Sequence, residues 1–350
     1  MPVFLEGVGG RILGDGSGRP AHAHVSGPPA LRIALVNNMP DSALEDTEIQ
    51  FSHLLGLAAD DLPVSLKLVS LPNVPRSEKG KERLREYYDG VEELWNHPYD
   101  AVIITGTEPQ QSNLKQEPYW GALVELLDWA ERNTASTILS CLAAHAAVLH
   151  GDGVPRVRLA DKQFGVYEFA CAEDSPLTRK TGGVLRFPHS RWNEVQAPAL
   201  TASGYQVLSS SPDAGVDCFV KRRGASWFVH FQGHPEYQDL TLFKEYRRDV
   251  RRYLRGERET YPRTPAGYFR GRAEQHVFEF REKATANRVE GLMCDFPEAM
   301  LTHQVENDWQ VSSIRLYRNW LEFLLQHKAE SLCYASAQAR SGGVSLPVPK

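Results

Sequence analysis

Cysteine is scarce in this chain, and long apolar runs are missing from its sequence. The 350 residues include five cysteines that form no Cys-x-x-Cys pair: Cys141, Cys171, Cys218, Cys294 and Cys333. An odd and scattered set argues against a disulfide framework and against a zinc site. No stretch approaches the roughly 18 uninterrupted apolar residues that a membrane helix needs. The start MPVFLEGVGG combines no basic segment with an apolar core, so we expect no secretory signal and a cytoplasmic location.

Basic residues are not in excess either. Lysine and arginine together number 39 against 44 acidic residues, which gives a formal net charge of −5. This balance argues against a nucleic-acid-binding protein, because such proteins normally carry a basic excess or stripe. Hydrophobic residues make up 42% and charged residues 24%, as in an average globular chain. The composition therefore excludes a chain that is disordered throughout, but it identifies no partner.

From residue 31 onward, short β-rich apolar runs alternate with amphipathic stretches. The predicted strands cover 31–38, 64–71, 100–106, 136–140, 204–211, 217–223 and 226–233, and the predicted helices cover 47–58, 81–95, 120–133, 142–151 and 240–256. Strands that alternate with helices of this length indicate βαβ units. The sequence therefore predicts an α/β fold with a doubly wound, mostly parallel sheet and a C-terminal extension.

Composition also suggests a division of the chain into four parts. Residues 1–30 are rich in glycine and proline, and we expect a flexible N-terminal extension there. The alternating pattern of residues 31–255 predicts the α/β catalytic domain. Residues 256–328 are less regular and are expected to pack on this domain, and 329–350 turn small and polar, as in a frayed tail.

Chemistry in a parallel sheet is expected at the carboxyl ends of the strands. Here these ends are ITGTEP, LSCLAA and FQGHPEY. Cys141 lies where a predicted strand runs directly into a helix, so the helix N-terminus can lower a thiol pKa and hold an oxyanion. The alternative is a buried core cysteine, which is the commonest state of an unpaired one.

The sequence HFQGHPEY strengthens the catalytic interpretation. A glycine turn after a strand presents His234, and Glu236 follows two residues later. A histidine oriented by a carboxylate is the base of a nucleophile–base–orienter triad. A metal site made by His230 and His234 is not expected, because Gly233 and Pro235 prevent the helix that would bring the two rings together. His145 and His150 are interpreted as structural or surface residues.

The run RRDVRRYLR at 247–255 is strongly basic. It lacks interleaved aromatic residues for base stacking, so most of its arginines are interpreted as a solvated helix face. An arginine on the inward side could instead hold a carboxylate with two hydrogen bonds.

Taken in order, the motifs of this chain resemble the homoserine O-acyltransferases of the O-succinyltransferase type. The resemblance covers residues 31–328 and depends on NNMPDSALEDTEIQFSHLLG, YDAVIITGTEP, STILSCLAAHAAVLHGDGVP, KQFGVYEF, FPHSRWNEV, DAGVDCFV, GHPEYQDLTLFKEYRRDV, YPRTPAGYF and a final W…NWL. It implies a class I glutamine amidotransferase-like, flavodoxin-like fold. It also implies that Cys141 is the acyl-accepting nucleophile, with His234 as general base and Glu236 as its orienting group.

The resemblance implies further site residues. Arg248 is expected to hold the carboxylate of the amino acid, and Ser190 to line the substrate pocket. Gln110 aligns with a position that distinguishes acetyl from succinyl donors, where the family has glutamate or glycine. The backbone N–H of Leu142, together with one from the loop after Gly106, would form the oxyanion hole.

The implied reaction is ping-pong transfer of a succinyl or acetyl group from its CoA thioester to the hydroxyl of L-homoserine, in methionine biosynthesis. The resemblance implies no permanently bound cofactor, no metal and a homodimer. This chain departs from the family at Asp41, Ser42 and Gln110, and residues 287–300 resemble an insertion. The acyl donor and the acceptor therefore stay open. Alternatives are another hydroxy amino acid such as serine, a glutaminase-like cysteine hydrolase, and a non-catalytic binding protein.

Overall fold

The computed structural model describes residues 3–6 and 29–341, with side chains as far as residue 333. Within these residues the main sheet has nine strands in the order β1-β3-β2-β5-β6-β13-β12-β9, with β4 beside β3. Its strands are β1 (Val3–Glu6), β2 (Leu31–Val36), β3 (Val64–Ser70), β4 (Asp89–Gly90), β5 (Ala101–Ile104), β6 (Ser136–Ser140), β9 (Gln206–Val207), β12 (Cys218–Arg223) and β13 (Ser226–Phe231). The pairs from β1 to β13 are parallel, whereas β12 runs antiparallel to both of its neighbours, β13 and β9.

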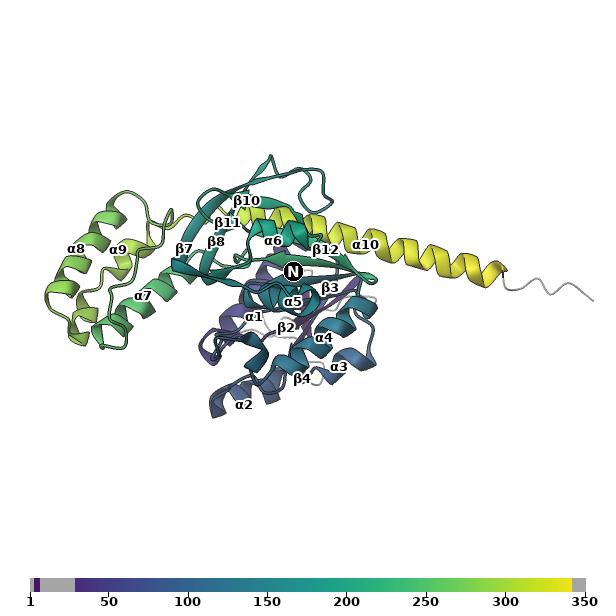
Figure 1. The fold of residues 1–350 in the computed structure, drawn as a ribbon, viewed down its shortest axis with the longest axis horizontal. Coiled ribbons are helices and arrows are strands. Elements are labelled where there is room, and N and C mark those ends of the chain that lie inside the picture. Colours follow the sequence, from purple (N-terminus) through teal and green to yellow (C-terminus); the bar gives the residue numbers. More distant parts are fainter. Residues whose placement is uncertain (1–2, 7–28, 342–350) are drawn as a thin grey trace, which may run out of the picture.

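Helices cover both faces of this sheet (Figure 1). Alternate residues of β2 point to opposite faces: Ile33 joins one apolar cluster and Ala34 joins another. The first cluster includes residues of α1 (Asp41–Ala59) and α10 (Gln310–Ser341), and the second includes residues of α3 (Glu92–Asn96), α4 (Trp120–Asn133) and α5 (Leu142–Asp152). Because both faces are buried, the strands have the nearly continuous apolar sequences typical of parallel sheets. The predicted doubly wound, mostly parallel sheet is confirmed.

A second, antiparallel sheet was not predicted. It contains β7 (Val157–Cys171), β8 (Val184–Glu194), β10 (Ser209–Ser211) and β11 (Gly215–Val216) in the order β11-β10-β7-β8. The first half of β7 is mostly exposed or half-buried and contains charged residues, so it lacks the apolar pattern of a strand. The single strand predicted at 204–211 is divided between the two sheets, because β9 pairs with β12 and β10 pairs with β7.

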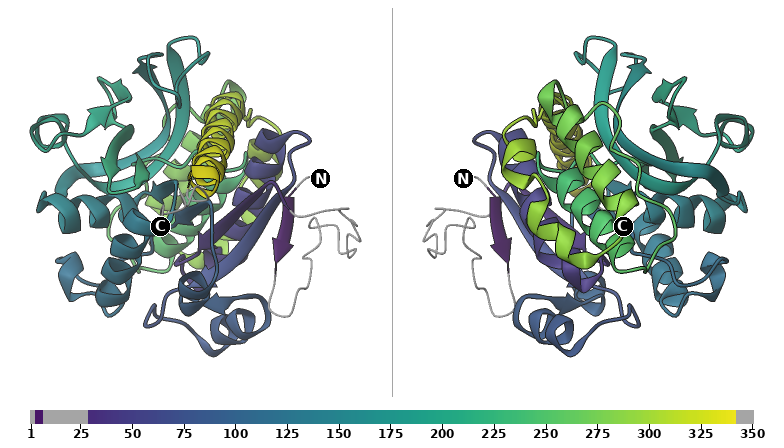
Figure 2. Two further views of the ribbon diagram at one scale, coloured as in Figure 1. Left: turned by 90° about the vertical axis from the view of Figure 1, so that its right-hand side faces the viewer. Right: turned by 90° about the vertical axis from the view of Figure 1, so that its left-hand side faces the viewer.

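Residues after β13 form a helical lobe beside the sheets. The lobe contains α7 (Thr241–Leu254), α8 (Arg272–Ala286), η2 (Glu290–Asp295) and α9 (Glu298–Thr302) around a separate apolar cluster that also includes Phe164 of β7. Figure 1 shows this lobe on one side of the sheets, whereas α10 crosses the molecule and projects on the opposite side. In Figure 2 the two sheets are seen with α10 beside them. The remaining short elements are α2 (Glu78–Tyr87), η1 (Leu114–Gln116) and α6 (Ala197–Ala202).

Three boundaries differ from the sequence-based expectations. The prediction of a flexible extension over 1–30 is wrong for Val3–Glu6, because these residues form β1 and pair with β3. Residues 7–28 lie outside the described residues. The prediction of a frayed tail from residue 329 is wrong as far as residue 341, because α10 continues to Ser341. Residues 342–350 also lie outside the described residues. The helix predicted over 81–95 is interrupted because Asp89 and Gly90 pair with β3. No helix in the described part of the chain is long and apolar enough to span a bilayer.

Candidate active site

Cys141 occupies a sharp turn between β6 and α5. Its backbone has φ 50° and ψ −108°, a conformation that residues with a Cβ rarely adopt. The Cys141 N–H donates to the carbonyl oxygen of Phe231 at 2.8 Å, which ties the turn to the neighbouring strand β13. Such strand-to-helix elbows present a nucleophile above the end of a sheet, and the cysteine is partly exposed here. The alternative of a fully buried core cysteine is therefore wrong.

His234 lies in the loop that follows β13, which is paired with β6. Its Nδ1 is 2.9 Å from Oε1 of Glu236, and the same oxygen accepts a hydrogen bond from Ser140 Oγ at 3.2 Å. The His234 N–H donates to the carbonyl of Pro188 at 2.8 Å, which fixes the loop. Burial acts to lower the pKa of His234, but the charge of Glu236 and a hydrogen bond with Cys141 outweigh it and raise this pKa well above its usual value.

Because Glu236 occupies Nδ1, Nε2 of His234 is the ring nitrogen left for the thiol. Both His234 and Glu236 are buried, so their interaction is little screened by solvent. A thiol, a histidine and an orienting carboxylate in this order can generate a thiolate and later return its proton. The structure thus brings together the three residues that the sequence selected as catalytic.

The loop after β5 approaches the start of α5. A Cβ added at Gly106 would lie 2.8 Å from Cβ and 3.0 Å from the backbone nitrogen of Leu142, so only glycine fits. Leu142 is the first residue of α5, and its N–H precedes the hydrogen bonds within the helix. The structure thus brings the loop at Gly106 next to the N-terminus of α5, and the role of these segments as an oxyanion hole stays a prediction.

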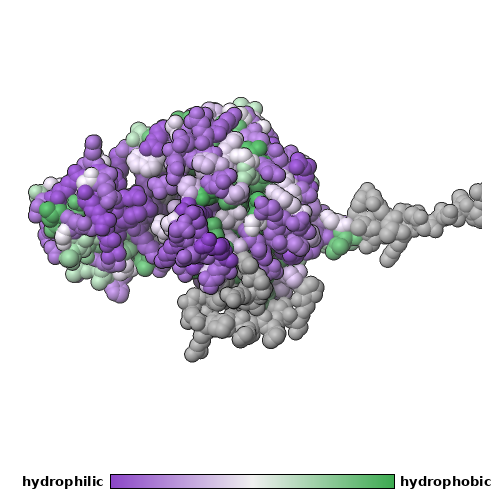
Figure 3. Space-filling model, turned by 90° about the horizontal axis from the view of Figure 1, so that it is seen from below, coloured by the Kyte–Doolittle hydropathy of each residue, from purple (hydrophilic) through white to green (hydrophobic). Residues whose placement is uncertain are grey.

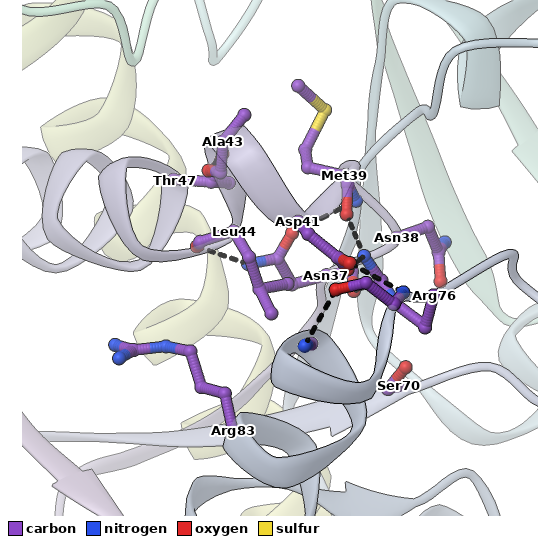
Figure 4. A network of polar contacts seen from close by, with 12 residues as sticks. Asn37, Asn38, Met39, Asp41, Ala43, Leu44, Thr47, Ser70, Arg76 and Arg83 are labelled. Carbon is purple, nitrogen blue, oxygen red and sulfur yellow. Dashed lines mark hydrogen bonds and ion pairs between the residues drawn. The ribbon is translucent and has the colours of Figure 1, made fainter.

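The loop that follows β2 supports the segment that leads to Gly106. The Asn38 backbone N–H donates to Thr105 Oγ1 at 2.8 Å, and the Asn38 side-chain amide donates to the Thr105 carbonyl at 3.2 Å. Figure 4 shows the Arg76 side chain beside this loop, where it donates to the carbonyls of Asn37 and Met39.

Asp41 is one of the departures from the family, and the structure gives it a local partner. Its carboxylate accepts from the backbone N–H of Ser77 at 2.7 Å and lies 3.4 Å from Arg76. Partial burial raises the pKa of Asp41, but these hydrogen bonds and the charge of Arg76 outweigh it and lower this pKa overall. Asp41 therefore anchors the Arg76 side chain next to the loop.

Beside Cys141, His234 and Glu236, the carboxylate of Glu245 in α7 interacts with four side chains. Ser190 Oγ and Tyr237 OH donate to its carboxylate, the latter at 2.8 Å, and Lys162 Nζ lies at 3.2 Å. The Arg248 guanidinium is 3.8 Å away and also pairs with Asp249 at 3.1 Å. We call Glu245, Ser190, Lys162, Tyr237 and Arg248 the Glu245 cluster. The Tyr237 ring stacks on the His234 ring with centroids 4.2 Å apart, so the cluster adjoins the triad.

Of the predicted substrate residues, Ser190 and Arg248 belong to this cluster and Gln110 does not. Gln110 is exposed, and its side chain makes no hydrogen bond or ion pair among the described residues. Glu108 of the same loop acts on Arg248 by its charge. Burial lowers the pKa of the Arg248 guanidinium, but Asp249, Glu245 and, more weakly, Glu108 outweigh it and raise this pKa. The roles of Gln110, Ser190 and Arg248 stay predictions.

With this geometry established, the chain can be compared with known proteins. A family model described as homoserine O-succinyltransferase matches residues 20–331. The chain is 44% identical over 291 residues to a homoserine O-succinyltransferase of Rhodopseudomonas palustris, covering 83% of this chain and 87% of that protein. It is 42% identical over 323 residues to one of Bradyrhizobium japonicum, covering 89% and 98%.

The chain belongs to the homoserine O-succinyltransferase family. The family resemblance drawn from the sequence motifs is therefore confirmed, and the protein is an acyltransferase. Among solved structures, the fold is similar to a glutamine amidotransferase of Thermotoga maritima, with 14% identity and a TM-score of 0.46 over 85% of this chain and 99% of that one.

In this family member the buried Gln232 connects α5, which follows Cys141, to the loop that carries His234. Gln232 Oε1 lies 2.9 Å from His145 Nε2 and accepts from the backbone N–H of Val195 at 2.7 Å. Its Nε2 donates to the carbonyls of Val195 and Val216 at 3.1 and 2.7 Å. His145 lies one helical turn after Cys141, and burial lowers its pKa to about 3, so its ring is neutral. The interpretation of His145 as structural fits this contact.

A second buried pair supports the glycine turn before His234. His189 Nε2 lies 3.2 Å from Asp217 Oδ1, and the same oxygen accepts from the Gly233 N–H at 2.8 Å. Burial lowers the pKa of His189 to about 4. Arg191 Nε donates to His189 Nδ1 at 3.1 Å, so the ring proton is on Nε2, facing Asp217. A Cβ at Gly233 would meet His189 Nε2 at 2.5 Å, which explains the glycine.

Sequence reasoning missed Lys162, Tyr237, Glu245, Gln232 and Asp217. Glu245 was recognisable in part, because it precedes Arg248 by one helical turn and would share its face. Lys162 lay in a segment that was not predicted as a strand, so nothing indicated its direction. Gln232 and Asp217 act through buried contacts with distant segments, which a single sequence does not reveal. No group of His, Cys, Asp or Glu arranged for a metal ion is found in the described part of the chain.

Proposed function

We propose that this protein transfers a succinyl or acetyl group from its CoA thioester to the side-chain hydroxyl of L-homoserine, through a thioester on Cys141. The observation that carries the proposal is the placement of Cys141, at a strained elbow after β6, next to the end of β13, whose following loop holds the His234–Glu236 pair. The name of the matched family favours succinyl as the acyl group, and it supports a role in methionine biosynthesis.

In the first step His234 takes the proton of the Cys141 thiol, and the thiolate attacks the carbonyl carbon of the acyl-CoA. The negative oxygen that forms is stabilised by the N–H of Leu142 and by the loop at Gly106. The carbon–sulfur bond to CoA then breaks, and His234 returns its proton to the departing CoA thiolate. Sulfur replaces sulfur, so this exchange is nearly balanced in free energy.

In the second step His234 takes the proton of the homoserine hydroxyl, and the alkoxide attacks the Cys141 thioester. The bond to Cys141 Sγ breaks, and the thiolate recovers the proton from His234. Arg248 is proposed to hold the carboxylate of homoserine and Ser190 to line its pocket, because both belong to the Glu245 cluster beside His234. Gln110 is proposed to lie near the acyl group of the donor.

The test is a matrix of two donors and two acceptors. Succinyl-CoA and acetyl-CoA are each combined with homoserine or serine, and released CoA and the ester are measured, with Cys141→Ala as control. We expect one donor to react with homoserine at least tenfold faster than with serine, and the variant to be inactive. Ammonia release from glutamine without ester formation would instead identify a glutaminase-like hydrolase. Ester formation with serine and not with homoserine would overturn the proposal that homoserine is the acyl acceptor.

A further inference from the structure

The arginines of α7 line a groove rather than a plain solvated face. The groove encloses about 530 Å³, and its cationic side chains come from α7 and the residue directly after it: Lys244, Arg247, Arg248, Arg251, Arg252 and Arg255. Its carboxylates are only Glu257 and Glu298, so six cations face two anions in a chain whose net charge is −5. Such a concentration of positive charge attracts anionic ligands.

The arrangement follows from the helical repeat of α7. Arg248, Arg251, Arg252 and Arg255 are three or four residues apart and therefore share one face. The opposite face is buried in the lobe through residues such as Tyr246 and Val250. A packed helix holds these guanidinium groups along a line of about 10 Å, at 1.5 Å per residue from 248 to 255.

Two of these arginines, Arg251 and Arg252, have side chains without a hydrogen-bond or ion-pair partner among the described residues. Arg247 pairs with Glu298 at 3.0 Å, and Arg255 pairs with Glu290 at 2.6 Å. By contrast, the side chains of Arg251 and Arg252 make no hydrogen bond or ion pair within residues 3–6 and 29–333. The charge of Arg251 acts on Glu290 only at longer range. Planar guanidinium groups without partners suit the bidentate binding of phosphate oxygens.

The groove adjoins the Glu245 cluster, which lies beside the candidate active site. Arg248 lines it and also belongs to the Glu245 cluster, whose Tyr237 stacks on His234. A ligand that reaches Cys141 with one end can therefore extend along α7 with the other. In Figure 3 the surface is strongly hydrophilic where the helical lobe adjoins the rest of the molecule.

We propose that this groove binds the phosphate groups of the nucleotide part of acyl-CoA, while the thioester lies at Cys141. This inference rests on the proposed use of a CoA thioester. The chemistry fits, because CoA carries its negative charge at the end remote from the thioester. Arg251 and Arg252 are the residues assigned to the phosphates.

The test uses Arg251→Gln/Arg252→Gln and two donors, the acyl-CoA and the acyl-pantetheine that lacks the nucleotide. We expect the ratio of the KM for acyl-CoA to the KM for acyl-pantetheine to rise about ten- to a hundredfold. The reason is that each lost hydrogen bond to a charged group weakens binding by about tenfold or more. The KM for homoserine should not change. The matched control is Arg132→Gln/Arg222→Gln, which removes the same charge from exposed residues near the other edge of the sheet and should leave the ratio unchanged.

An unchanged ratio in Arg251→Gln/Arg252→Gln would overturn the inference while leaving the proposed function intact. If the wild type transfers no acyl group at all, the proposed function fails, and calorimetry with CoA then tests the groove separately. CoA binding that is weakened tenfold in this variant supports the groove, and equal binding overturns it. Competition by inorganic phosphate as strong as that by adenosine 3′,5′-bisphosphate would overturn the assignment to a nucleotide.

Discussion

At the scale of single residues, the candidate site depends on backbone turns that hold its side chains in place. Cys141 and Gly233 lie at turns that follow adjacent parallel strands, β6 and β13, and the side chains near these turns fix their geometry. Strained backbone of the kind seen at Cys141 costs roughly 1–3 kcal/mol and persists only where surrounding contacts hold it. The hydrogen bond from Cys141 N–H to Phe231 is one such contact.

Gly233→Ala tests the support of the His234 turn. The added Cβ would lie 2.5 Å from His189 Nε2 and 2.8 Å from Asp217 Oδ1, so the turn must shift and carry His234 with it. A displacement of about 1 Å can cost on the order of 100-fold in rate, and we expect a loss of kcat of this size. The control is Gly121→Ala in α4, where a Cβ meets nothing within 4 Å and alanine should slightly raise stability. Full activity of Gly233→Ala would refute the assigned role of this turn.

Glu236→Gln tests the orienting carboxylate. The amide can still contact His234 Nδ1, but its charge is gone, so the pKa of His234 should fall from its raised value. We expect acyl transfer to slow by roughly 100- to 10,000-fold, as for other losses in acid–base catalysis. The pKa change is checked by NMR titration of the His234 ring. A ring that titrates at the wild-type pH would show that Glu236 does not act through its charge.

At the scale of elements, the strand–helix alternation predicted the main sheet because its strands are buried on both faces. The same alternation is enough to place the loops that carry Cys141 and His234 at one edge of the sheet. The antiparallel strands β7 and β8 were missed, since Lys162 and its polar neighbours interrupt the apolar pattern. Ser190 and Lys162, which meet at Glu245, come from these two strands. This part of the Glu245 cluster thus depended on pairing that a local pattern does not encode.

Helix α10 fastens the C-terminal end of the chain to the main sheet. Trp320 is fully buried, and its Nε1 donates to Ser136 Oγ of β6 at 3.0 Å. Trp320→Ala should lower the free energy of unfolding by about 3–5 kcal/mol through the cavity it leaves. Val311→Ala on the same helix is the control, because Val311 is 76% exposed and its loss should change stability by less than about 0.5 kcal/mol. Urea unfolding measures both, and equal effects would contradict this packing.

At the scale of the whole molecule, three parts of the chain meet at the candidate site. The main sheet supplies Cys141 and His234, the antiparallel sheet supplies Ser190 and Lys162, and the helical lobe supplies Glu245 and Arg248. The lobe is joined to β7 by hydrogen bonds between Ala266 and both Phe164 and Val166. The candidate site is therefore assembled only while the two sheets and the helical lobe stay folded together.

Buried neutral histidines should make this stability fall in acid. Burial lowers the pKa of His145 and His230 to about 3 and that of His189 to about 4, below the 6.5 of an unfolded histidine. Between pH 6.5 and 4 the unfolded chain therefore binds protons that the native state does not, and each such histidine costs roughly 1.4 kcal/mol per pH unit. The raised pKa of His234 has the opposite effect. Its contribution to the free energy of unfolding is full below pH 6.5 and is lost as the pH rises from there through the raised pKa.

His230→Phe isolates this effect. The ring of His230 stacks on Phe219 outside the candidate site, and its Nε2 has no hydrogen-bond partner among the described residues. Urea unfolding between pH 6.5 and 4 should show a slope with pH that is shallower by about one proton than in the wild type. Val229→Ala, the preceding strand residue, should lower stability equally at every pH and so serves as the packing control. Parallel curves for His230→Phe and the wild type would contradict the neutral buried state.

The central claim is the thioester on Cys141, and intact-protein mass spectrometry tests it most directly. Wild type and Cys141→Ala are each incubated with succinyl-CoA or acetyl-CoA without acceptor, and homoserine is then added. We predict a mass gain of one acyl group on the wild type, its absence from Cys141→Ala, and its discharge by homoserine with formation of the ester. The variant also controls for the exposed Cys294 and Cys333. Turnover by Cys141→Ala, or turnover by the wild type without any adduct under rapid quenching, would contradict the two-step mechanism.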